Sequence, residues 1–201
     1  MTERLGIFGG SFSPPHTGHL YAARTFVREM KLDRLLIIPA CISPGKTVTD
    51  PVPAEMRLAM CRLAFAGLPE AEVSDTEIRR GGVSYTADTL RELTRPGREI
   101  FVLCGTDTAM SLDRWHTPGV LFELATFVCI RRHHDPAFEE TFARKNEAYR
   151  ASYGHTVRLI DAPAHPASST EVRAALARGE EPKEVCPAVL AYIRENGLYH
   201  T

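Results

Sequence analysis

The chain has 201 residues, of which 44% are hydrophobic and 24% are charged, a balance typical of a globular protein with one sizeable core. Its formal net charge of −1 argues against the basic surface that a nucleic-acid partner needs, and no apolar run approaches the length of a membrane span. We therefore expect a single domain over residues 1–201, with no nucleic-acid partner and no membrane partner.

The cysteines indicate a reducing compartment. There are five of them, widely spaced and without a C-x-x-C pair, and the N-terminus shows no cationic and apolar leader. We interpret them as reduced thiols of a cytoplasmic protein. The sequence does not define an oligomeric state and is compatible with a homo-oligomer.

Apolar runs that are typical of buried strands alternate with helical patterns along the chain. The predicted strands are Arg4–Phe8, Arg34–Pro39, Ala71–Asp75, Glu99–Cys104, Ala125–Ile130 and Thr156–Ile160. The predicted helices are Gly18–Met30, Pro53–Phe65, Thr86–Thr94, Thr106–Leu112, Pro136–Tyr149, Ser169–Arg178 and Pro187–Glu195.

The strands are continuously apolar rather than alternating, as in Leu35-Leu36-Ile37-Ile38. Continuous runs indicate burial on both faces, and hence a parallel sheet with helices on both sides. The fold class we predict is α/β, a doubly wound parallel sheet with a helical C-terminal end. In such sheets ligands bind beyond the carboxyl ends of the strands.

A Gly-rich turn joins the first predicted strand to the first predicted helix. Gly9 and Gly10 are followed by two prolines, and His16 and His19 open the helix. Glycines allow the main chain to approach an anion, and the free N–H groups of a helix start face negative charge. Each of these features alone is also compatible with a plain turn.

A second polar run starts a helix near the C-terminal end, Ser168-Ser169-Thr170-Glu171-Val172-Arg173. Hydroxyl residues at that place are common N-caps. Arg173 lies about one turn into the helix, from where a guanidinium can reach an anion at the helix start.

Together the two runs resemble the nucleotidyltransferase superfamily. The first resembles its G-G-x-F-x-P-x-H-x-G-H signature at every defining position, and the second resembles its I-S-S-T-x-x-R motif, with Ala167 in place of Ile. The resemblance implies a Rossmann-like fold and an ATP site. Its residues would be Gly9, Gly10, Ser11, Phe12, His16, Gly18, His19, Ser168, Ser169, Thr170 and Arg173.

Three further runs resemble bacterial nicotinate-nucleotide adenylyltransferases. They are Ser84–Leu90 (S-Y-T-x-D-T-L), Gly105-x-Asp107 followed by Trp115, and a strand that ends at Arg131-Arg132. The resemblance implies that Gly105 and Asp107 belong to the ATP site, where an acid can accept from ribose hydroxyls. Tyr85, Thr86, Trp115 and Arg132 would bind nicotinate mononucleotide, with Arg131 as a solvated neighbour.

On spacing alone, two of these residues have other interpretations. Asp107 is equally compatible with a helix cap, and Trp115 with a core position. The resemblance favours ribose binding for Asp107 and stacking on a flat pyridine ring for Trp115.

The loop that ends at Gly45-Lys46 resembles the family's P-x(4)-P-H-K segment, with Gly45 in place of His. Lys46 is then a candidate ligand of a substrate phosphate. A Walker A loop is excluded, because Ala40 stands where that motif needs Gly and no helix follows directly.

No protein-bound metal is expected. His16-x-x-His19 lacks the i, i+4 spacing and the carboxylate of a helical zinc site, and His133-His134-Asp135 is the other candidate considered. A Mg²⁺ ion held mainly by ATP phosphate oxygens needs no protein cage.

The implied reaction is transfer of the adenylyl group of ATP to nicotinate mononucleotide, with His16, His19, Lys46 and Arg173 as the catalytic residues and His19 stabilising the transition state. The alternatives are an adenylyltransferase for nicotinamide mononucleotide or phosphopantetheine, and a non-catalytic nucleotide sensor on the same fold. Gly45 is the residue that favours a sensor.

Overall fold

The computed structural model describes residues 2–44, 52–131, 135–162 and 167–199. The strands are β1 (Glu3–Gly10), β2 (Arg34–Pro39), β3 (Ala71–Val73), β4 (Arg98–Cys104), β5 (Thr126–Arg131) and β6 (Arg158–Asp161). The helices are α1 (Thr17–Met30), α2 (Ala54–Phe65), α3 (Thr76–Arg80), α4 (Thr86–Leu93), α5 (Thr106–Ala109), α6 (Pro118–Leu124), α7 (Pro136–Tyr153), α8 (Ser169–Ala177) and α9 (Pro187–Glu195), with a 3₁₀ turn η1 (Leu112–Arg114).

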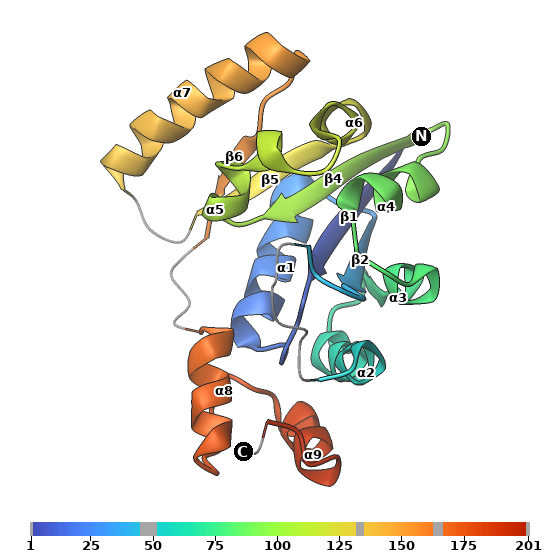
Figure 1. The fold of residues 1–201 in the computed structure, drawn as a ribbon, viewed down its shortest axis with the longest axis vertical. Coiled ribbons are helices and arrows are strands. Elements are labelled where there is room, and N and C mark those ends of the chain that lie inside the picture. The colour runs from blue at the N-terminus through green and yellow to red at the C-terminus, as the bar shows by residue number, and fades with distance from the viewer. Residues whose placement is uncertain (1, 45–51, 132–134, 163–166, 200–201) are drawn as a thin grey trace. The chain divides into compact units, whose positions relative to one another are not determined.

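The six described strands form one sheet in the order β3-β2-β1-β4-β5-β6 (Figure 1). β1 pairs parallel with β4, β4 with β5 and β5 with β6. This is the strand order of a doubly wound sheet, in which the chain winds outward from β1 and then outward again from β4. The predicted Rossmann-like α/β fold is confirmed.

The chain separates into two compact units made of interleaved segments. The first unit comprises residues 1–8, 25–35 and 85–164, and the second comprises residues 9–24, 36–84 and 165–201.

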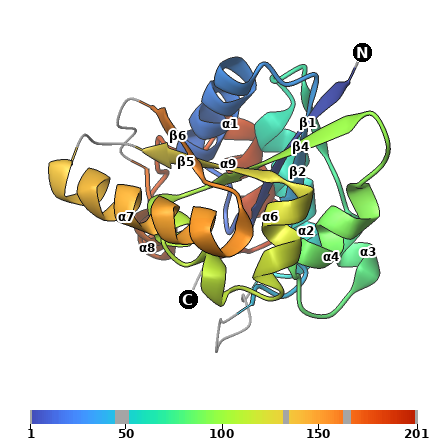
Figure 2. The same cartoon turned by 90° about the horizontal axis from the view of Figure 1, so that it is seen from above.

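In the first unit, the central residues of β4 and β5 are buried on both faces of the sheet, as their continuous apolar runs predict. α6 packs against α4, α7 and η1 (Figure 2). On β1, Gly6 permits a close approach, because a Cβ added there would lie 2.4 Å from Leu32 Cδ1 and 3.0 Å from Phe26 Cε1 of α1.

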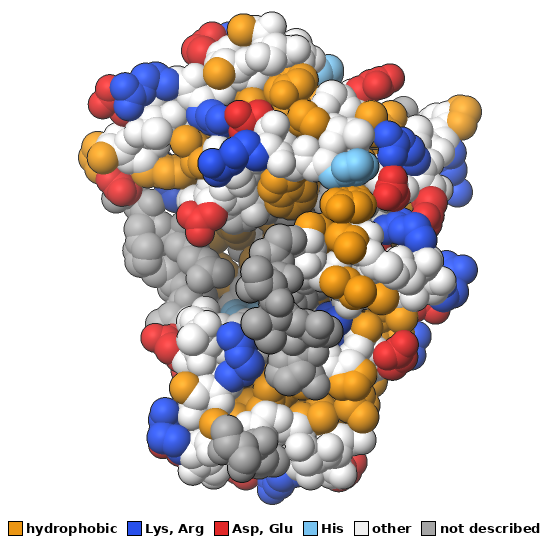
Figure 3. Space-filling model, viewed as in Figure 1, with side chains coloured by type: hydrophobic (Ala, Val, Ile, Leu, Met, Phe, Trp, Pro, Cys, Tyr) orange, Lys and Arg blue, Asp and Glu red, His pale blue; other side chains and the backbone are white. Residues whose placement is uncertain are grey.

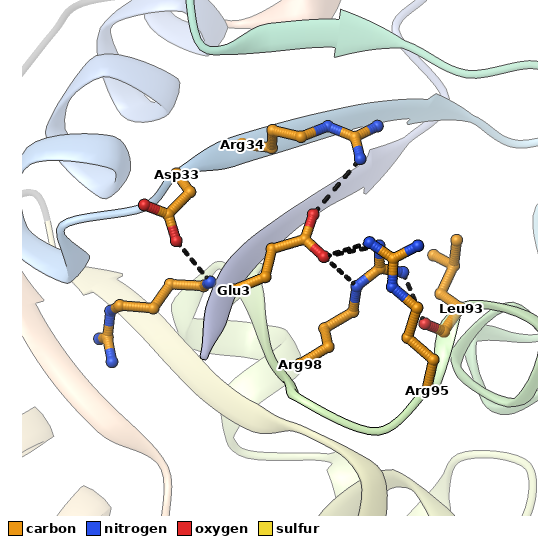
Figure 4. A network of polar contacts seen from close by, with 7 residues as sticks. Glu3, Asp33, Arg34, Leu93, Arg95 and Arg98 are labelled. Atoms are coloured by element: carbon orange, nitrogen blue, oxygen red, sulfur yellow. Dashed lines mark hydrogen bonds and ion pairs between the residues drawn. The ribbon is translucent and has the colours of Figure 1, made fainter. Parts of the chain in front are cut away.

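The edge of the sheet where the strands begin carries a charge network in the same unit (Figure 4). The Glu3 carboxylate accepts hydrogen bonds from Arg34, Arg95 and Arg98, with nitrogen–oxygen distances of 3.3, 2.5 and 2.9 Å. The hydrogen bond from Arg95, followed by that from Arg98, lowers the pKa of Glu3 from 4.5 to about 2. This carboxylate therefore joins β1 to β2, to β4 and to the turn that precedes β4.

In the second unit, α2 packs against β3 and α9. An apolar cluster joins α2, α8 and α9 through Met60, Val172, Leu176, Val189 and Ile193 (Figure 1). The predicted helical C-terminal end is thus present and has its own buried core. On the face drawn in Figure 3, acidic and basic side chains are interspersed.

Two predicted elements end at least two residues earlier in the structure, and two helices were not predicted. The predicted helix Thr106–Leu112 ends at Ala109, because the Ser111 hydroxyl donates to the Asp107 carbonyl (2.9 Å) and takes the acceptor that the helix would use. The predicted strand Ala71–Asp75 ends at Val73. α3 and α6 are absent from the prediction.

Within the described residues, none of the helices combines the length and the apolar character that crossing a bilayer requires. All five cysteines are free thiols.

Candidate active site

The loop between β1 and α1 is anchored in the core of the second unit. Phe12 is 2% exposed and adopts a φ of +49°, which is uncommon for a residue other than glycine. Its ring meets the edge of Phe65 of α2 with centroids 6.0 Å apart, and that of His19 with centroids 5.1 Å apart. The Ser13–Pro14 peptide bond in the same loop is cis.

His16 at the end of the loop and His19 in the first turn of α1 lie against each other, with ring centroids 3.8 Å apart. The His16 backbone N–H donates to Nδ1 of His19 at 3.2 Å. Since Nδ1 accepts in this bond, the proton of the neutral His19 ring resides on Nε2. His19 therefore offers a hydrogen-bond donor from its far side, and His16 is buried beneath it.

The space beside Gly18 is narrow, because His16 packs against it. A Cβ added at Gly18 would lie 3.0 Å from His16 Nδ1 and 3.2 Å from Ala167 Cβ. The start of α1 thus approaches residue 167, which precedes α8. The absence of a side chain at Gly18 and the small one at Ala167 permit this close contact.

Arg173 connects the two predicted ATP motifs. Its guanidinium donates to the Ser13 carbonyl at 2.8 Å and to the Thr170 hydroxyl at 3.3 Å. Residues that are 160 positions apart in the sequence are therefore brought together, as the prediction of one shared site requires.

Ser168 occupies the N-cap position of α8, but its side chain makes no capping hydrogen bond. The first backbone N–H groups of a helix have no acceptor within the helix. The N-terminus of α8, three hydroxyl residues and Arg173 can together receive an anion such as a phosphate group.

The segment after β2 is hydrogen-bonded to the end of β1 and to the β1–α1 loop. The Ala40 N–H donates to the Gly10 carbonyl at 2.9 Å, and the hydroxyls of Ser11 and Ser43 are 2.9 Å apart. The Cys41 N–H donates to the hydroxyl of Ser84, the first residue of the predicted Ser84–Leu90 motif. Gly45 and Lys46 lie outside the described residues.

Arg57 is a residue that the sequence prediction missed. It is 2% exposed and donates to carbonyl groups of both segments just described, at Ser11, Ala40 and Cys41. Its position in the sequence could have indicated this. Arg57, Cys61 and Phe65 are spaced four residues apart, so the charged Arg57 lies on the buried face of α2.

In the first unit, Tyr85 is the N-cap residue of α4 and Thr86 is the first helical residue. The Tyr85 ring stacks on His116 with centroids 4.3 Å apart and an angle of 30°. Trp115 follows η1 and is only partly buried, so a fully buried core position is excluded. His116 was not selected as a site residue from the sequence. Its position next to Trp115 was the only indication in the sequence that it belongs to this region.

Gly105 and Asp107 follow β4 directly. Gly105 is the N-cap residue of α5, without a side-chain cap, and Asp107 lies exposed in the first turn. Asp107 is therefore not a helix cap, and its carboxylate faces solvent.

Arg131, at the end of β5, corrects one prediction. Instead of being a solvated neighbour, it forms ion pairs with Asp161 of β6 and Glu139 of α7, and its side chain is 12% exposed. Arg132 lies outside the described residues, as do His133 and His134.

Across the described ranges, no three or more His, Cys, Asp or Glu side chains are gathered where they could hold a metal ion.

Comparisons with known proteins identify the family of the chain. Residues 7–175 match the family model described as cytidylyltransferase-like. A relative from Roseiflexus sp. (strain RS-1), named a probable nicotinate-nucleotide adenylyltransferase, is 39% identical, and the alignment covers 97% of each chain. A relative of the same name from Chromobacterium violaceum is 38% identical, with 99% of this chain and 100% of that protein covered.

Solved structures agree on the fold. The Plasmodium falciparum nicotinic acid mononucleotide adenylyltransferase complexed with NaAD superposes with a TM-score of 0.69 at 20% identity, covering 98% of this chain and 97% of that one. The chain belongs to the cytidylyltransferase-like family and, within it, to the nicotinate-nucleotide adenylyltransferases.

Proposed function

We propose that this protein transfers the adenylyl group of ATP to nicotinate mononucleotide, giving nicotinate adenine dinucleotide and pyrophosphate in NAD biosynthesis. Family membership over the whole chain supports the reaction. The single structural observation that carries it is the hydrogen bond from Arg173 to Ser13, which joins the β1–α1 loop to the start of α8.

In this reaction an oxygen of the mononucleotide phosphate attacks the α-phosphorus of ATP. The bond from that phosphorus to the oxygen bridging to the β-phosphorus breaks, and pyrophosphate leaves with the electron pair. The substrate supplies the nucleophile, so the enzyme needs no activated Ser or Cys. Its contribution is alignment of the two phosphates and neutralisation of the charge that develops on the leaving group.

The ATP phosphates bind at the loop and helix start of the second unit. Backbone N–H groups of Gly9, Gly10, Ser11, Phe12 and Gly18, with the residues Ser168, Ser169 and Thr170, surround them. His16 and His19 contact the phosphates, and the Nε2–H of His19 strengthens its hydrogen bond as charge grows on the departing oxygen. Arg173 and Lys46 supply fixed positive charge.

The resemblance to the family assigns the remaining contacts. The ribose hydroxyls of ATP donate to Asp107 beside Gly105, where the carboxylate is exposed. The backbone N–H groups of Tyr85 and Thr86 bind the nicotinate carboxylate, and Trp115 stacks on the pyridine ring. Arg132 and Lys46 bind the mononucleotide phosphate.

Magnesium fits this site as a companion of ATP. Mg²⁺ would be held mainly by the triphosphate oxygens of ATP, as it commonly is in nucleotide sites. When bound, it would supply further neutralisation of the leaving pyrophosphate.

We extend the proposal to the whole molecule. The family match and the coverage of the relatives support one nucleotidyltransferase domain over residues 1–201. Five free thiols support a reducing compartment such as the cytoplasm.

The test is pyrophosphate release from Mg·ATP, measured in parallel with nicotinate mononucleotide, nicotinamide mononucleotide and 4′-phosphopantetheine. We expect rapid turnover with nicotinate mononucleotide and a kcat/KM at least tenfold lower with each of the others. Turnover with phosphopantetheine alone would refute the assignment of the Ser84–Leu90 and Trp115 motifs. ATP binding without release from any acceptor would indicate a nucleotide sensor.

A further inference from the structure

The Arg57 side chain on α2 is buried and holds three separate segments of the second unit. Nε donates to the Val52 carbonyl at 3.1 Å, and Nη1 donates to the Ser11 carbonyl at 2.7 Å. Nη2 donates to the carbonyls of Ala40 at 2.6 Å and Cys41 at 3.1 Å. Over the described ranges, no carboxylate pairs with Arg57, so main-chain carbonyl groups are its acceptors.

This arrangement is both costly and specific. Burying an ionised group is unfavourable unless its donors are satisfied, and here each nitrogen of the guanidinium has a carbonyl acceptor. Four hydrogen bonds use four of its five N–H donors, and a buried network of this kind rigidifies the groups that it joins. The planar guanidinium therefore fixes the relative positions of residues 11, 40, 41 and 52.

Two of these segments carry proposed substrate contacts. Ser11 belongs to the β1–α1 loop and precedes Phe12, whose ring lies 5.1 Å from that of His19. Cys41 is five positions before Lys46 in the sequence. The hydrogen bond between the hydroxyls of Ser11 and Ser43 joins the same two segments a second time.

We propose that Arg57 is a positioning residue for adenylyl transfer: its buried guanidinium aligns the β1–α1 loop with the segment that follows β2, without contacting either substrate. The inference rests on the proposed function. Its charge has a second consequence, because a buried cation bonded to the Ser11 carbonyl adds positive potential beside the loop that receives the phosphates.

A purely structural role predicts different behaviour. If Arg57 served the core alone, its replacement would lower the melting temperature and leave the kcat of each folded molecule unchanged. A positioning role predicts a lower kcat in molecules that are fully folded, because misplacement of catalytic groups by about 1 Å costs roughly 10²-fold in rate.

The decisive variant is Arg57→Lys, with Arg62→Lys as its matched control. Arg62 lies on the same helix, is exposed, and loses the same guanidinium in its variant. An ammonium keeps the charge but donates from one point, so it cannot reach carbonyl groups of three segments at once. kcat and the KM values for ATP and nicotinate mononucleotide are measured well below each melting temperature and referred to the folded fraction.

We expect the kcat of Arg57→Lys to fall at least fivefold, with Arg62→Lys within twofold of the wild type. A kcat of Arg57→Lys within fivefold of the wild type, or an equal loss in Arg62→Lys, overturns the inference. A wild-type enzyme that does not turn over nicotinate mononucleotide refutes the proposed function instead, so the two failures are distinguishable.

If Arg57→Lys does not stay folded, Arg57→Gly with added guanidinium ion replaces it. The inference then requires kcat per folded molecule to rise at least fivefold with guanidinium concentration. It is overturned if guanidinium raises only the folded fraction.

Discussion

The catalytic role that we propose for His19 depends on one hydrogen bond. Because its Nδ1 accepts from the His16 backbone, the neutral ring can donate only from Nε2. The Phe12 ring packs against the His19 ring in a T-shaped arrangement and restricts its orientation. A donor that is already oriented needs no reorganisation when charge develops on the leaving pyrophosphate.

Replacing His19 with alanine should lower kcat/KM by about 10²–10³-fold, the range observed when one donor to a developing anion is removed. His19→Gln should retain more activity than His19→Asn, because the longer amide reaches the position of Nε2. Steady-state kinetics with both substrates measure this, with the exposed His155→Ala as control. A loss of less than threefold in His19→Ala would contradict the role.

Trp115 is the only tryptophan in the chain, which makes its role directly observable. It is partly exposed after η1, so a ligand ring can reach it. Nicotinate mononucleotide should quench the tryptophan fluorescence in a saturable manner, whereas ribose 5-phosphate should not. Trp115→Ala should raise the KM for the mononucleotide at least tenfold with little change in the KM for ATP. An unchanged KM for the mononucleotide would exclude stacking.

The limits of sequence reasoning are clear at the residue level. The two runs of the proposed ATP site can be recognised in the sequence because each is short and contiguous. The buried role of Arg57 could not be predicted, since its acceptors are carbonyl groups up to 46 positions away and any residue type supplies a carbonyl. The ion pairs of Arg131 could not be predicted either, because their carboxylate partners lie on two other elements, β6 and α7.

Among the elements, long apolar strands were predicted within one or two residues at most ends. β2 spans Arg34–Pro39 as predicted, because four consecutive large aliphatic residues leave no alternative to a buried strand. α3 has five residues and α6 has seven, too few for helical periodicity to emerge. The sequence marks these two helices only by single residues at their ends. Pro118 lies in the first turn of α6, and Gly81 follows the end of α3.

The packing of α1 on β1 gives a prediction at this scale. Gly6→Ala places a Cβ 2.4 Å from Leu32 Cδ1, so the buried Leu32 side chain must shift, at an expected cost of about 1–3 kcal/mol in unfolding free energy. Gly67→Ala is the matched control, since an added Cβ there meets nothing within 4 Å. Urea unfolding of both variants measures the difference. Equal midpoints would show that β1 does not need the close approach.

For the molecule as a whole, the Glu3 network predicts how stability depends on pH. The arginines around Glu3, Arg95 foremost, lower its pKa from 4.5 to about 2, so the folded state prefers the carboxylate. Its contribution is therefore present above pH 4.5 and is lost as the pH falls toward 2.

Glu3→Gln should accordingly be less stable than the wild type at pH 7, and the gap should narrow at pH 3. Urea midpoints at the two pH values measure this, with Glu195→Gln at an exposed position as control. A gap that stays constant or widens on acidification would contradict the charge network.

The central claim is that the mononucleotide phosphate attacks the α-phosphorus of ATP. We would incubate the enzyme with Mg·ATP and nicotinate mononucleotide carrying ¹⁸O in its phosphate, and determine the mass of each product. The account predicts one pyrophosphate per dinucleotide, with all of the label in nicotinate adenine dinucleotide and none in pyrophosphate. Formation of AMP, label in the pyrophosphate, or the absence of a dinucleotide would contradict it.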